Sequence, residues 1–156
     1  MKIRLYLLFI CLGFSVSFFM TAQQALATLG ASVDSVESDR KALSASRRAM
    51  AVRDGYTVYE IDSDSTVVRE YVSSSGVVFG IAWNGLIHPD LDQLLGSYVG
   101  EYQKALQQTP RNQGRRNIRL KTDRIVVEKW GHMRNLQGRA YDPALIPSGV
   151  NVDEIK

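Results

Sequence analysis

Apolar and polar residues follow different periods along the chain, and each period predicts a different kind of element. Residues 91–106 carry apolar side chains in a broad stripe at helical spacing, which predicts the main core helix. Residues 32–52 carry a thin stripe, about one apolar residue in two turns, which predicts a peripheral N-terminal helix. Alternation with a period of two predicts strands at 56–61, 66–72, 77–83, 118–120 and 125–130, and a further one at 136–141.

The order of these elements predicts one α+β domain. The turns at 62–65 and 73–76 are short and polar, so we expect the first three strands to form an antiparallel meander. Pro89 and Asp90 favour the start of the core helix, because proline suits the first helical position and an acid stabilises the first turn. The expected fold is an N-terminal helix, a three-strand meander, a core helix and two or three further antiparallel strands.

Two features of this pattern concern packing. In the third strand the bulky Phe79, Ile81 and Trp83 alternate with smaller residues, so we expect a central strand covered on both sides, with a helix close to Gly80. In the core helix Gly96 and Gly100 lie opposite the apolar stripe, where each costs about 1 kcal/mol relative to alanine. Either another backbone or a partner packs against these two glycines, or they are tolerated at the surface.

The first residues have the pattern of a secretory signal peptide. Lys2 and Arg4 precede the apolar run 5–20, and the segment closes with Ala25-Leu26-Ala27. We expect cleavage after Ala27, export to the periplasm or beyond, and a single exported domain over residues 28–156. The alternative is an uncleaved anchor, although the run is shorter than the roughly 20 residues that a spanning helix needs.

Cleavage changes the chemistry and the charge that remain. It removes Cys11, which is the single cysteine, so the exported domain has no disulfide and no thiol nucleophile. The net charge of +3 includes Lys2 and Arg4, and without them the chain carries only +1. Such a balance gives no general electrostatic reason to bind nucleic acid, and no later segment is apolar enough for stable membrane insertion.

One segment departs from this neutral balance. Residues 111–124 contain six lysine and arginine residues against Asp123 alone. Arg115, Arg116 and Arg119 are therefore candidates for docking an acidic partner, such as an anionic glycan or a lipid headgroup. The alternative is a solvated basic loop followed by an edge strand.

The sequence has little that predicts catalysis or metal binding. His88 stands before Asp90 and Asp92, but helix capping accounts for both acids, and no second cluster supplies further ligands. His132 is the weak catalytic candidate, because a catalytic histidine also needs a nucleophile and an orienting acid. No motif of a known hydrolase or phosphate-binding loop is present, and we predict no metal and no cofactor.

Aromatic residues offer one further kind of site. Trp83, Trp130, Tyr98 and Tyr102 would suit a carbohydrate platform, although large aromatic side chains more often belong to a core. A small-ligand carrier that uses the face of Trp83 is a related alternative, which requires a concave apolar pocket.

Several runs, taken in order, resemble one bacterial family. They are Ala-Leu-Ala-Thr-Leu-Gly at 25–30, Val-Val-Arg-Glu-Tyr-Val at 67–72, Val-Val-Phe-Gly-Ile-Ala-Trp at 77–83, Pro-Asp-Leu at 89–91, Leu-Leu-Gly-Ser-Tyr at 94–98, Gly-His-Met-Arg at 131–134, Gly-Arg-Ala at 138–140 and Pro-Ser-Gly-Val at 147–150. The chain is similar to the family catalogued as domain of unknown function 2844, short exported proteins of Gram-negative bacteria. The resemblance implies export and a single domain, and it implies no activity and no site residues.

From these observations we predict a non-enzymatic binding or interaction module of the cell envelope. An envelope protein and an anionic glycan are the candidate partners. The alternatives are an envelope hydrolase acting on glycan or peptide, with His132 and a carboxylate as acid and base, and the small-ligand carrier.

Overall fold

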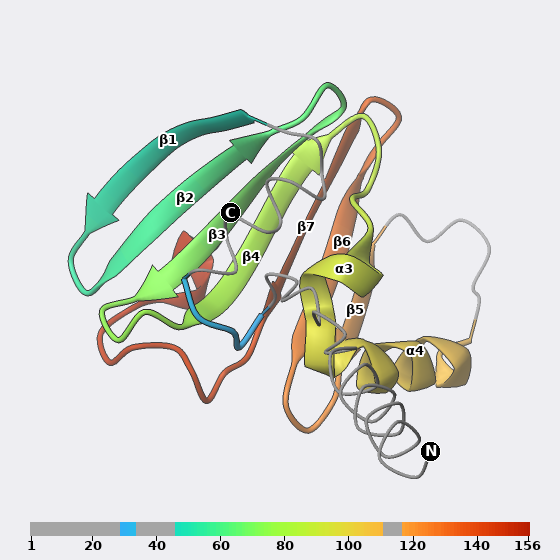
Figure 1. The fold of residues 1–156 in the computed structure, drawn as a ribbon. Coiled ribbons are helices and arrows are strands. Elements are labelled where there is room, and N and C mark those ends of the chain that lie inside the picture. Colours follow the sequence, from blue (N-terminus) through green and yellow to red (C-terminus); the bar gives the residue numbers. More distant parts are fainter. Residues whose placement is uncertain (1–28, 34–45, 111–116) are drawn as a thin grey trace, which may run out of the picture.

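The computed structural model describes residues 29–33, 46–110 and 117–156, with the backbone alone at 46–49. The described residues form one seven-stranded sheet in the order β1-β2-β3-β4-β7-β6-β5, and all neighbouring strands are antiparallel (Figure 1). The strands are β1 (Ser46–Arg53), β2 (Tyr56–Asp62), β3 (Thr66–Ser73), β4 (Val78–Gly85), β5 (Ile118–Lys121), β6 (Val126–His132) and β7 (Asn135–Tyr141).

Two meanders make up this sheet, and they meet at its centre. Strands β1 to β4 follow one another along the chain, and so do β5 to β7, whereas β7 pairs with β4. The predicted meander and the predicted later strands are confirmed, including β7, and β4 lies in the middle as expected. The α+β class is thereby confirmed.

The predicted N-terminal helix is wrong for residues 46–52, which belong to strand β1. Residues 34–45 of that prediction lie outside the described residues, as does the predicted signal peptide 1–27. A thin apolar stripe gives a helix little surface to bury. Here Asp54 and Gly55, with Gly55 at φ +82°, make a two-residue turn that pairs Arg53 with Tyr56, so the segment gains the hydrogen bonds of a strand.

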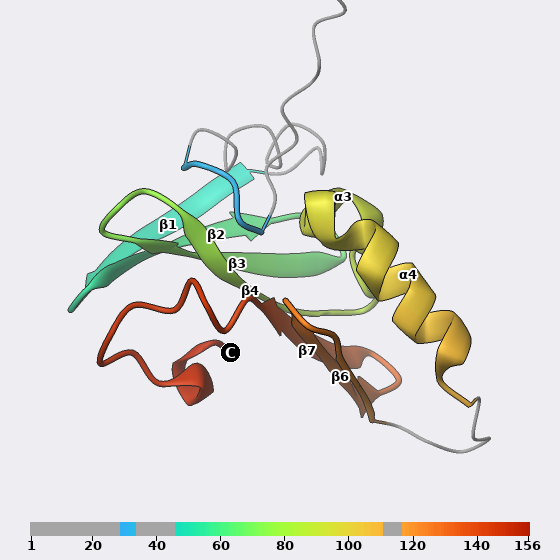
Figure 2. The same cartoon turned by 90° about the horizontal axis from the view of Figure 1, so that it is seen from below.

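Different segments cover the two faces of the sheet (Figure 2). Helices α3 (Leu91–Leu95) and α4 (Val99–Gln108), joined by the 3₁₀ turn η1 (Gly96–Tyr98), lie on one face, which we call the helix side. Residues 142–156, which we call the C-terminal strap, lie on the other face, the strap side, and include the 3₁₀ turn η2 (Val152–Glu154). The strap therefore lies along the body of the domain, with one 3₁₀ turn near its end.

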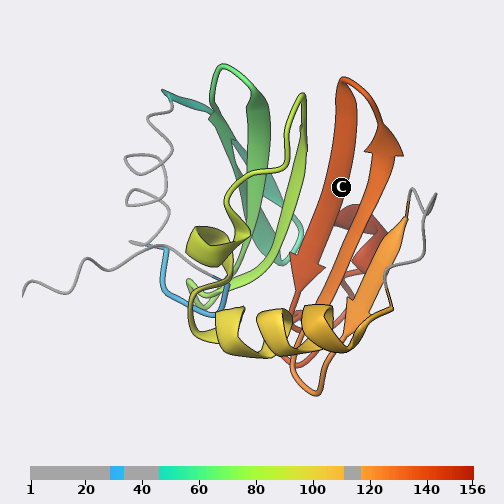
Figure 3. The ribbon, with the colours of Figure 1, turned by 90° about the vertical axis from the view of Figure 1, so that its right-hand side faces the viewer.

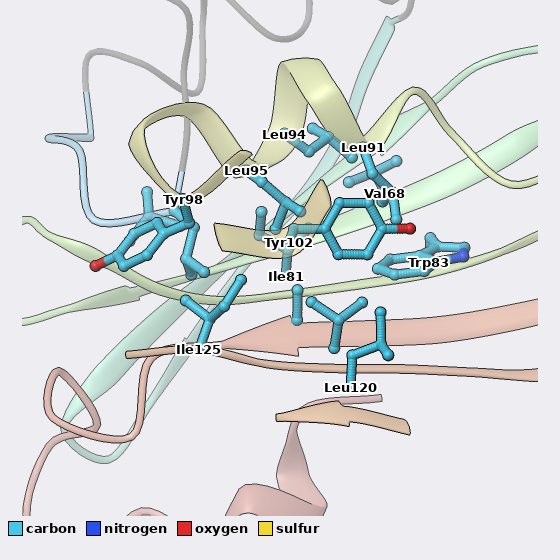
Figure 4. Packing of buried hydrophobic residues seen from close by; sticks show 14 of the residues in the cluster. Val68, Ile81, Trp83, Leu91, Leu94, Leu95, Tyr98, Tyr102, Leu120 and Ile125 are labelled. Atoms are coloured by element: carbon cyan, nitrogen blue, oxygen red, sulfur yellow. The ribbon is translucent and has the colours of Figure 1, made fainter. Parts of the chain in front are cut away.

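The helix side holds the larger core (Figure 4). Its members include Leu94, Leu95 and Ile81, which are at most 1% exposed, and Trp83, which is 2% exposed. Asp90 caps α3, because its side chain accepts a hydrogen bond from the backbone of Asp92 at 3.0 Å. The core helix is confirmed, but it starts two residues later than predicted: its first residue is Leu91, with Asp90 as the cap and Pro89 before it.

The core helix is not continuous. Gly96 has φ +47° and ψ −115°, a conformation that glycine adopts without strain, and there the chain turns from α3 into α4. Figure 3 shows α4 lying across the strands, and its end moves away from the core. Leu106, predicted to belong to the core stripe, is 44% exposed for this reason.

The strap side holds a second, smaller cluster around Tyr56, Tyr71 and Phe79. A β-bulge interrupts the pairing of β3 with β4 between Tyr71 and Val72, so Phe79 packs on the strap side with Ala82 rather than with Ile81 and Trp83. The cover over Gly80 is also different from the prediction. A side-chain Cβ at Gly80 would lie 2.9 Å from Cδ1 of Ile155, so the strap, and not a helix, lies close to this glycine.

None of the helices in the described part of the chain has the length and apolar content that a bilayer crossing requires.

Candidate functional site

A hollow with a distinctive lining lies on the strap side, where the last strands meet the end of the strap. Its volume is about 730 Å³, and we call it the β5–β7 groove. The residues that matter for its chemistry are Asn117, Arg119, Glu128, Trp130, Arg139 and Lys156.

Strand register explains why these side chains share one face. Arg119 of β5 is paired with Glu128 of β6, and Glu128 is paired with Arg139 of β7. Because successive side chains of a strand point to opposite faces, Val127 and Ala140 enter the helix-side core while their neighbours Glu128 and Arg139 face the strap. Trp130 follows two residues after Glu128 and therefore lies on the same face.

Glu128 connects the two arginines. Its Oε1 lies 3.1 Å from Nε of Arg119, and its Oε2 accepts a hydrogen bond from Nε of Arg139. Arg139 is 18% exposed and also donates through Nη1 to the carbonyl of Val152 at 2.9 Å, so it fastens the strap to the sheet. Arg119 is 68% exposed, and its contact with Glu128 is made through Nε, one of the three nitrogens of its guanidinium.

A chain of amide groups holds the indole of Trp130. Its Nε1 donates to Oε1 of Gln137 at 3.1 Å, and Nε2 of Gln137 donates to Oδ1 of Asn135 at 2.9 Å. Asn84 donates to the same oxygen of Asn135 at 3.0 Å. Trp130 is only half-buried, so this network fixes the edge of a ring that still presents surface to the groove.

The structure places one of the three predicted arginines. Arg119 lines the β5–β7 groove, beside an aromatic ring and a second arginine. Arg115 and Arg116 lie outside the described residues. The basic segment therefore contributes at least one side chain to a concave surface.

Trp83, a candidate for a ligand surface, lies in the core, which is the alternative considered for the aromatic residues. Trp83 is buried in the helix-side core, where its ring lies so close to Gly138 that a Cβ there would be 2.2 Å from Cζ2. Its Nε1 donates to Nδ1 of His88 at 2.9 Å. Tyr98 and Tyr102 are buried in the same core, so the only tryptophan or tyrosine of the predicted platform that reaches the groove is Trp130, among the described residues.

His88 has a structural environment. Burial first, and then the positive charge of Lys129, lower the pKa of its imidazole below the usual value. The neutral ring is the form whose Nδ1 accepts the indole hydrogen bond. Asp92, the second acid of this segment, accepts a hydrogen bond from Gln103 at 3.1 Å, and the described residues hold no cluster of three groups able to bind a metal ion.

The two candidate glycines of the core helix have separate explanations. Gly96 is needed for the turn between α3 and α4. A Cβ at Gly100 would have no atom of the described chain within 4 Å, so nothing there packs closely against it. The surface around Gly100 is thus open.

His132 is the last residue of β6 and is exposed. Its Nδ1 lies 3.4 Å from the backbone oxygen of Met133, and no acid in the described part of the chain forms an ion pair with it. The orienting acid that the hydrolase alternative pairs with this histidine is therefore not seen among its contacts in the described residues.

Sequence reasoning missed Glu128, Arg139 and the role of Gln137. Each belongs to an alternating strand, and the signal that would have found them is the pairing of one strand with the next. The register of β5 with β6 depends on the fold rather than on local sequence.

Comparison with known proteins gives one match. No curated protein and no solved structure is similar to this chain. The model of a protein family described as "Protein of unknown function (DUF2844)" matches residues 25–155, which confirms the resemblance drawn from the sequence. Because the match spans nearly all of the 156 residues, the chain belongs to the DUF2844 family.

Proposed function

We propose that this chain is an exported, non-enzymatic binding protein of the bacterial cell envelope, and that its binding site is the β5–β7 groove. The observation that supports the site is the combination of a 730 Å³ hollow with a half-buried tryptophan and an exposed arginine. Ligand sites are typically concave surfaces of this size, with a few fixed polar groups around an apolar or aromatic surface.

Export is supported by the sequence of residues 1–27, in which a basic start, an apolar run and Ala-Leu-Ala follow one another. The mature chain would begin at Thr28, just before Leu29, which is buried at 1% exposure. Mass spectrometry of the protein from its native host measures this directly. A mass that still includes residues 1–27 would contradict cleavage.

A binding role, rather than catalysis, is supported by the environment of the titratable groups. Both carboxylate oxygens of Glu128 are paired with arginines, and His132, at the end of β6, does not line the groove. The lining therefore offers ion pairing and hydrogen bonding, which are interactions suited to holding a ligand.

Site-specific crosslinking in intact cells tests the site. A photo-crosslinking amino acid replaces Asn117, which precedes β5 and lines the groove, and in a matched variant it replaces Lys121, an exposed residue at the other end of β5 and outside the groove. We expect a reproducible adduct at position 117 and none at position 121. The chain is recovered with an antibody, because a tag after Lys156 would disturb the contact of this residue with Tyr71.

Equal labelling at both positions, or none at either, would contradict the assignment of the groove as the binding site.

A further inference from the structure

We infer that the β5–β7 groove binds an acidic saccharide, a sugar chain that carries carboxylates, with Trp130 and Arg119 making the two principal contacts. This inference rests on the proposed function and gives the chemical class of the ligand. It follows from the charge of the lining, from the aromatic surface and from the shape of the site.

The charge of the lining favours an anion. Arg119, Arg139 and Lys156 line the groove with the carboxylate of Glu128, and a second carboxylate, that of Asp153, lies 3.7 Å from Nη1 of Arg139. Lys129 also lines it, but its ammonium donates a hydrogen bond to the hydroxyl of Tyr102 at 2.7 Å and so contributes less to the charge in the groove. The remaining side chains carry a net positive charge, which attracts anionic ligands.

Arg119 is the cation that is able to contact a ligand directly. Glu128 lies 3.1 Å from its Nε, and the side chain of Arg119 is nevertheless 68% exposed, so its guanidinium is accessible from the groove. A planar guanidinium with two neighbouring donors matches the geometry of a carboxylate, and such charge-assisted pairs are stronger than neutral hydrogen bonds. Arg139 is instead engaged with the strap through Val152 and acts as a positioning residue.

Trp130 favours a sugar over a simple anion. The negative face of an indole attracts the slightly positive C–H face of a pyranose ring, and a flat ring loses little conformational entropy on binding. Gln137 fixes the indole through Nε1, so the ring is already positioned. The amide of Asn117 and the remaining lone pairs of Glu128 are available to sugar hydroxyls.

Two other occupants fit the groove less well. A lipid tail requires a deep apolar pocket, whereas the apolar lining residues here are Ile118, Trp130 and Ile155, and Ile155 is fully buried under its neighbours. An extended peptide that adds a strand needs a long sheet edge, but β5 has only four residues, and the groove lies over the face of β5 to β7.

The direct test measures binding of a defined probe to the purified chain by calorimetry and by tryptophan fluorescence. The probe is tetragalacturonate, and its control is the fully methyl-esterified tetramer, which has the same rings without charge. We expect the acid to bind at least about tenfold more tightly than the ester, and its affinity to fall as salt is raised.

Variants locate the site. Arg119→Met and Trp130→Phe are each expected to weaken tetragalacturonate binding at least about tenfold. Lys121→Met removes an exposed cation of the same strand outside the groove and is expected to leave binding unchanged. Arg119 is an exposed side chain, so its variant tests the inference even if Trp130→Phe lowers the melting temperature.

Three outcomes would overturn the inference. The first is equal binding of tetragalacturonate and its methyl ester, and the second is equal binding of tetragalacturonate and tetraglutamate, an acidic peptide used as a further probe. The third is wild-type affinity for tetragalacturonate in the Arg119 and Trp130 variants. If these occur while the crosslinker at position 117 captures a defined envelope protein, the proposed function stands and the ligand class is wrong. If neither the probes nor the crosslinker give binding at the groove, both proposals fail.

Discussion

The segments that cover the two faces of the sheet are held in place by different kinds of contact. On the helix side, Leu91, Leu94 and Leu95 pack against the sheet by apolar contact (Figure 4). Within the strap, only Ile155 is fully buried; Leu145, Ile146, Val150 and Val152 pack against the strap-side cluster while partly buried, and hydrogen bonds add to these contacts. The hydroxyl of Tyr71 donates to the backbone oxygen of Lys156 at 2.8 Å and accepts from its nitrogen at 3.0 Å.

This difference explains where the hollows are. The strap is narrower than the sheet, so it leaves the 730 Å³ groove over β5 to β7 and a second hollow of about 410 Å³ over β1 to β3. On the helix side, broad apolar side chains bury the sheet beneath α3 and the start of α4, and Trp83 is 2% exposed there. The hollow beside α4 is smaller, about 290 Å³, and is lined mainly by polar residues. The strap is held to the sheet at a few contacts, and the sheet surface between these contacts forms the two hollows, which are concave enough for a ligand.

The largest expected effect on stability comes from comparing two glycines, one on each face of the sheet. Gly138→Ala places a Cβ 2.2 Å from the ring of Trp83 and 2.6 Å from the backbone oxygen of Glu128, neither of which can move freely. Gly80→Ala meets only the end of the Ile155 side chain, at 2.9 Å. We expect Gly138→Ala to lower the free energy of unfolding by about 3 kcal/mol or more and Gly80→Ala by about 1–2 kcal/mol, measured by urea denaturation.

A substitution in the strap tests whether Ile155 causes the expected loss of stability at Gly80. Ile155→Val removes Cδ1, so Gly80→Ala is expected to cost less in that background than in the wild type. Additive effects of the two substitutions would show that Ile155 is not what limits the space at Gly80.

The next effect tests the hydrogen-bonded anchor. Tyr71→Phe removes both contacts with Lys156 and is expected to cost about 1–2 kcal/mol. Amide hydrogen exchange of Ile155 and Lys156 should accelerate more than that of Leu94 in the helix-side core. In the matched variant Tyr102→Phe, which loses a contact with Lys129 on the helix side, exchange in the strap should stay at the wild-type rate.

The smallest effect is a pH dependence on the helix side. Since the pKa of His88 is lowered in the folded chain, the unfolded chain binds a proton at a pH where the folded chain does not. Stability contributed by neutral His88 is therefore present above pH 6.5, the usual value, and is lost as the pH falls toward the lowered one. Denaturation midpoints between pH 7.5 and about 5.5 measure this slope.

His88→Gln should give a shallower slope than the wild type, whereas His132→Gln removes an exposed imidazole and should keep the wild-type slope. Equal slopes in all three proteins would contradict a role for neutral His88 in stability.

The sequence pattern correctly predicted the elements that depend on residues close together in the chain. The strands that begin at Tyr56 and Thr66 alternate cleanly and are bounded by turn residues, and Asp90 carries its capping chemistry in its own side chain. Strand β1 was missed because its pattern is weak and its stability comes from pairing with β2. Gly96 was assigned to the back of a continuous helix, since periodicity does not reveal a change of direction.

The candidate site was predicted only in part for the same reason. Arg119 was found because it belongs to a run of like charges, which is a local signal. Its partners Glu128 and Arg139 come from two other strands and meet it through the register of β5, β6 and β7. Such cross-strand neighbours are set by the assembled sheet and are not encoded at a fixed spacing.

The position of β7 has a consequence for how the chain acquires its fold. Strand β4 stays a sheet edge until β7 arrives, because Gly80 pairs with Tyr141, and the space over Gly80 is filled only by Ile155. Contacts between residues so distant in sequence are slow to form, since a long loop must close first. A chain that lengthens from its N-terminus therefore completes the middle of its sheet last, and until then its central strand is open to pairing with other chains.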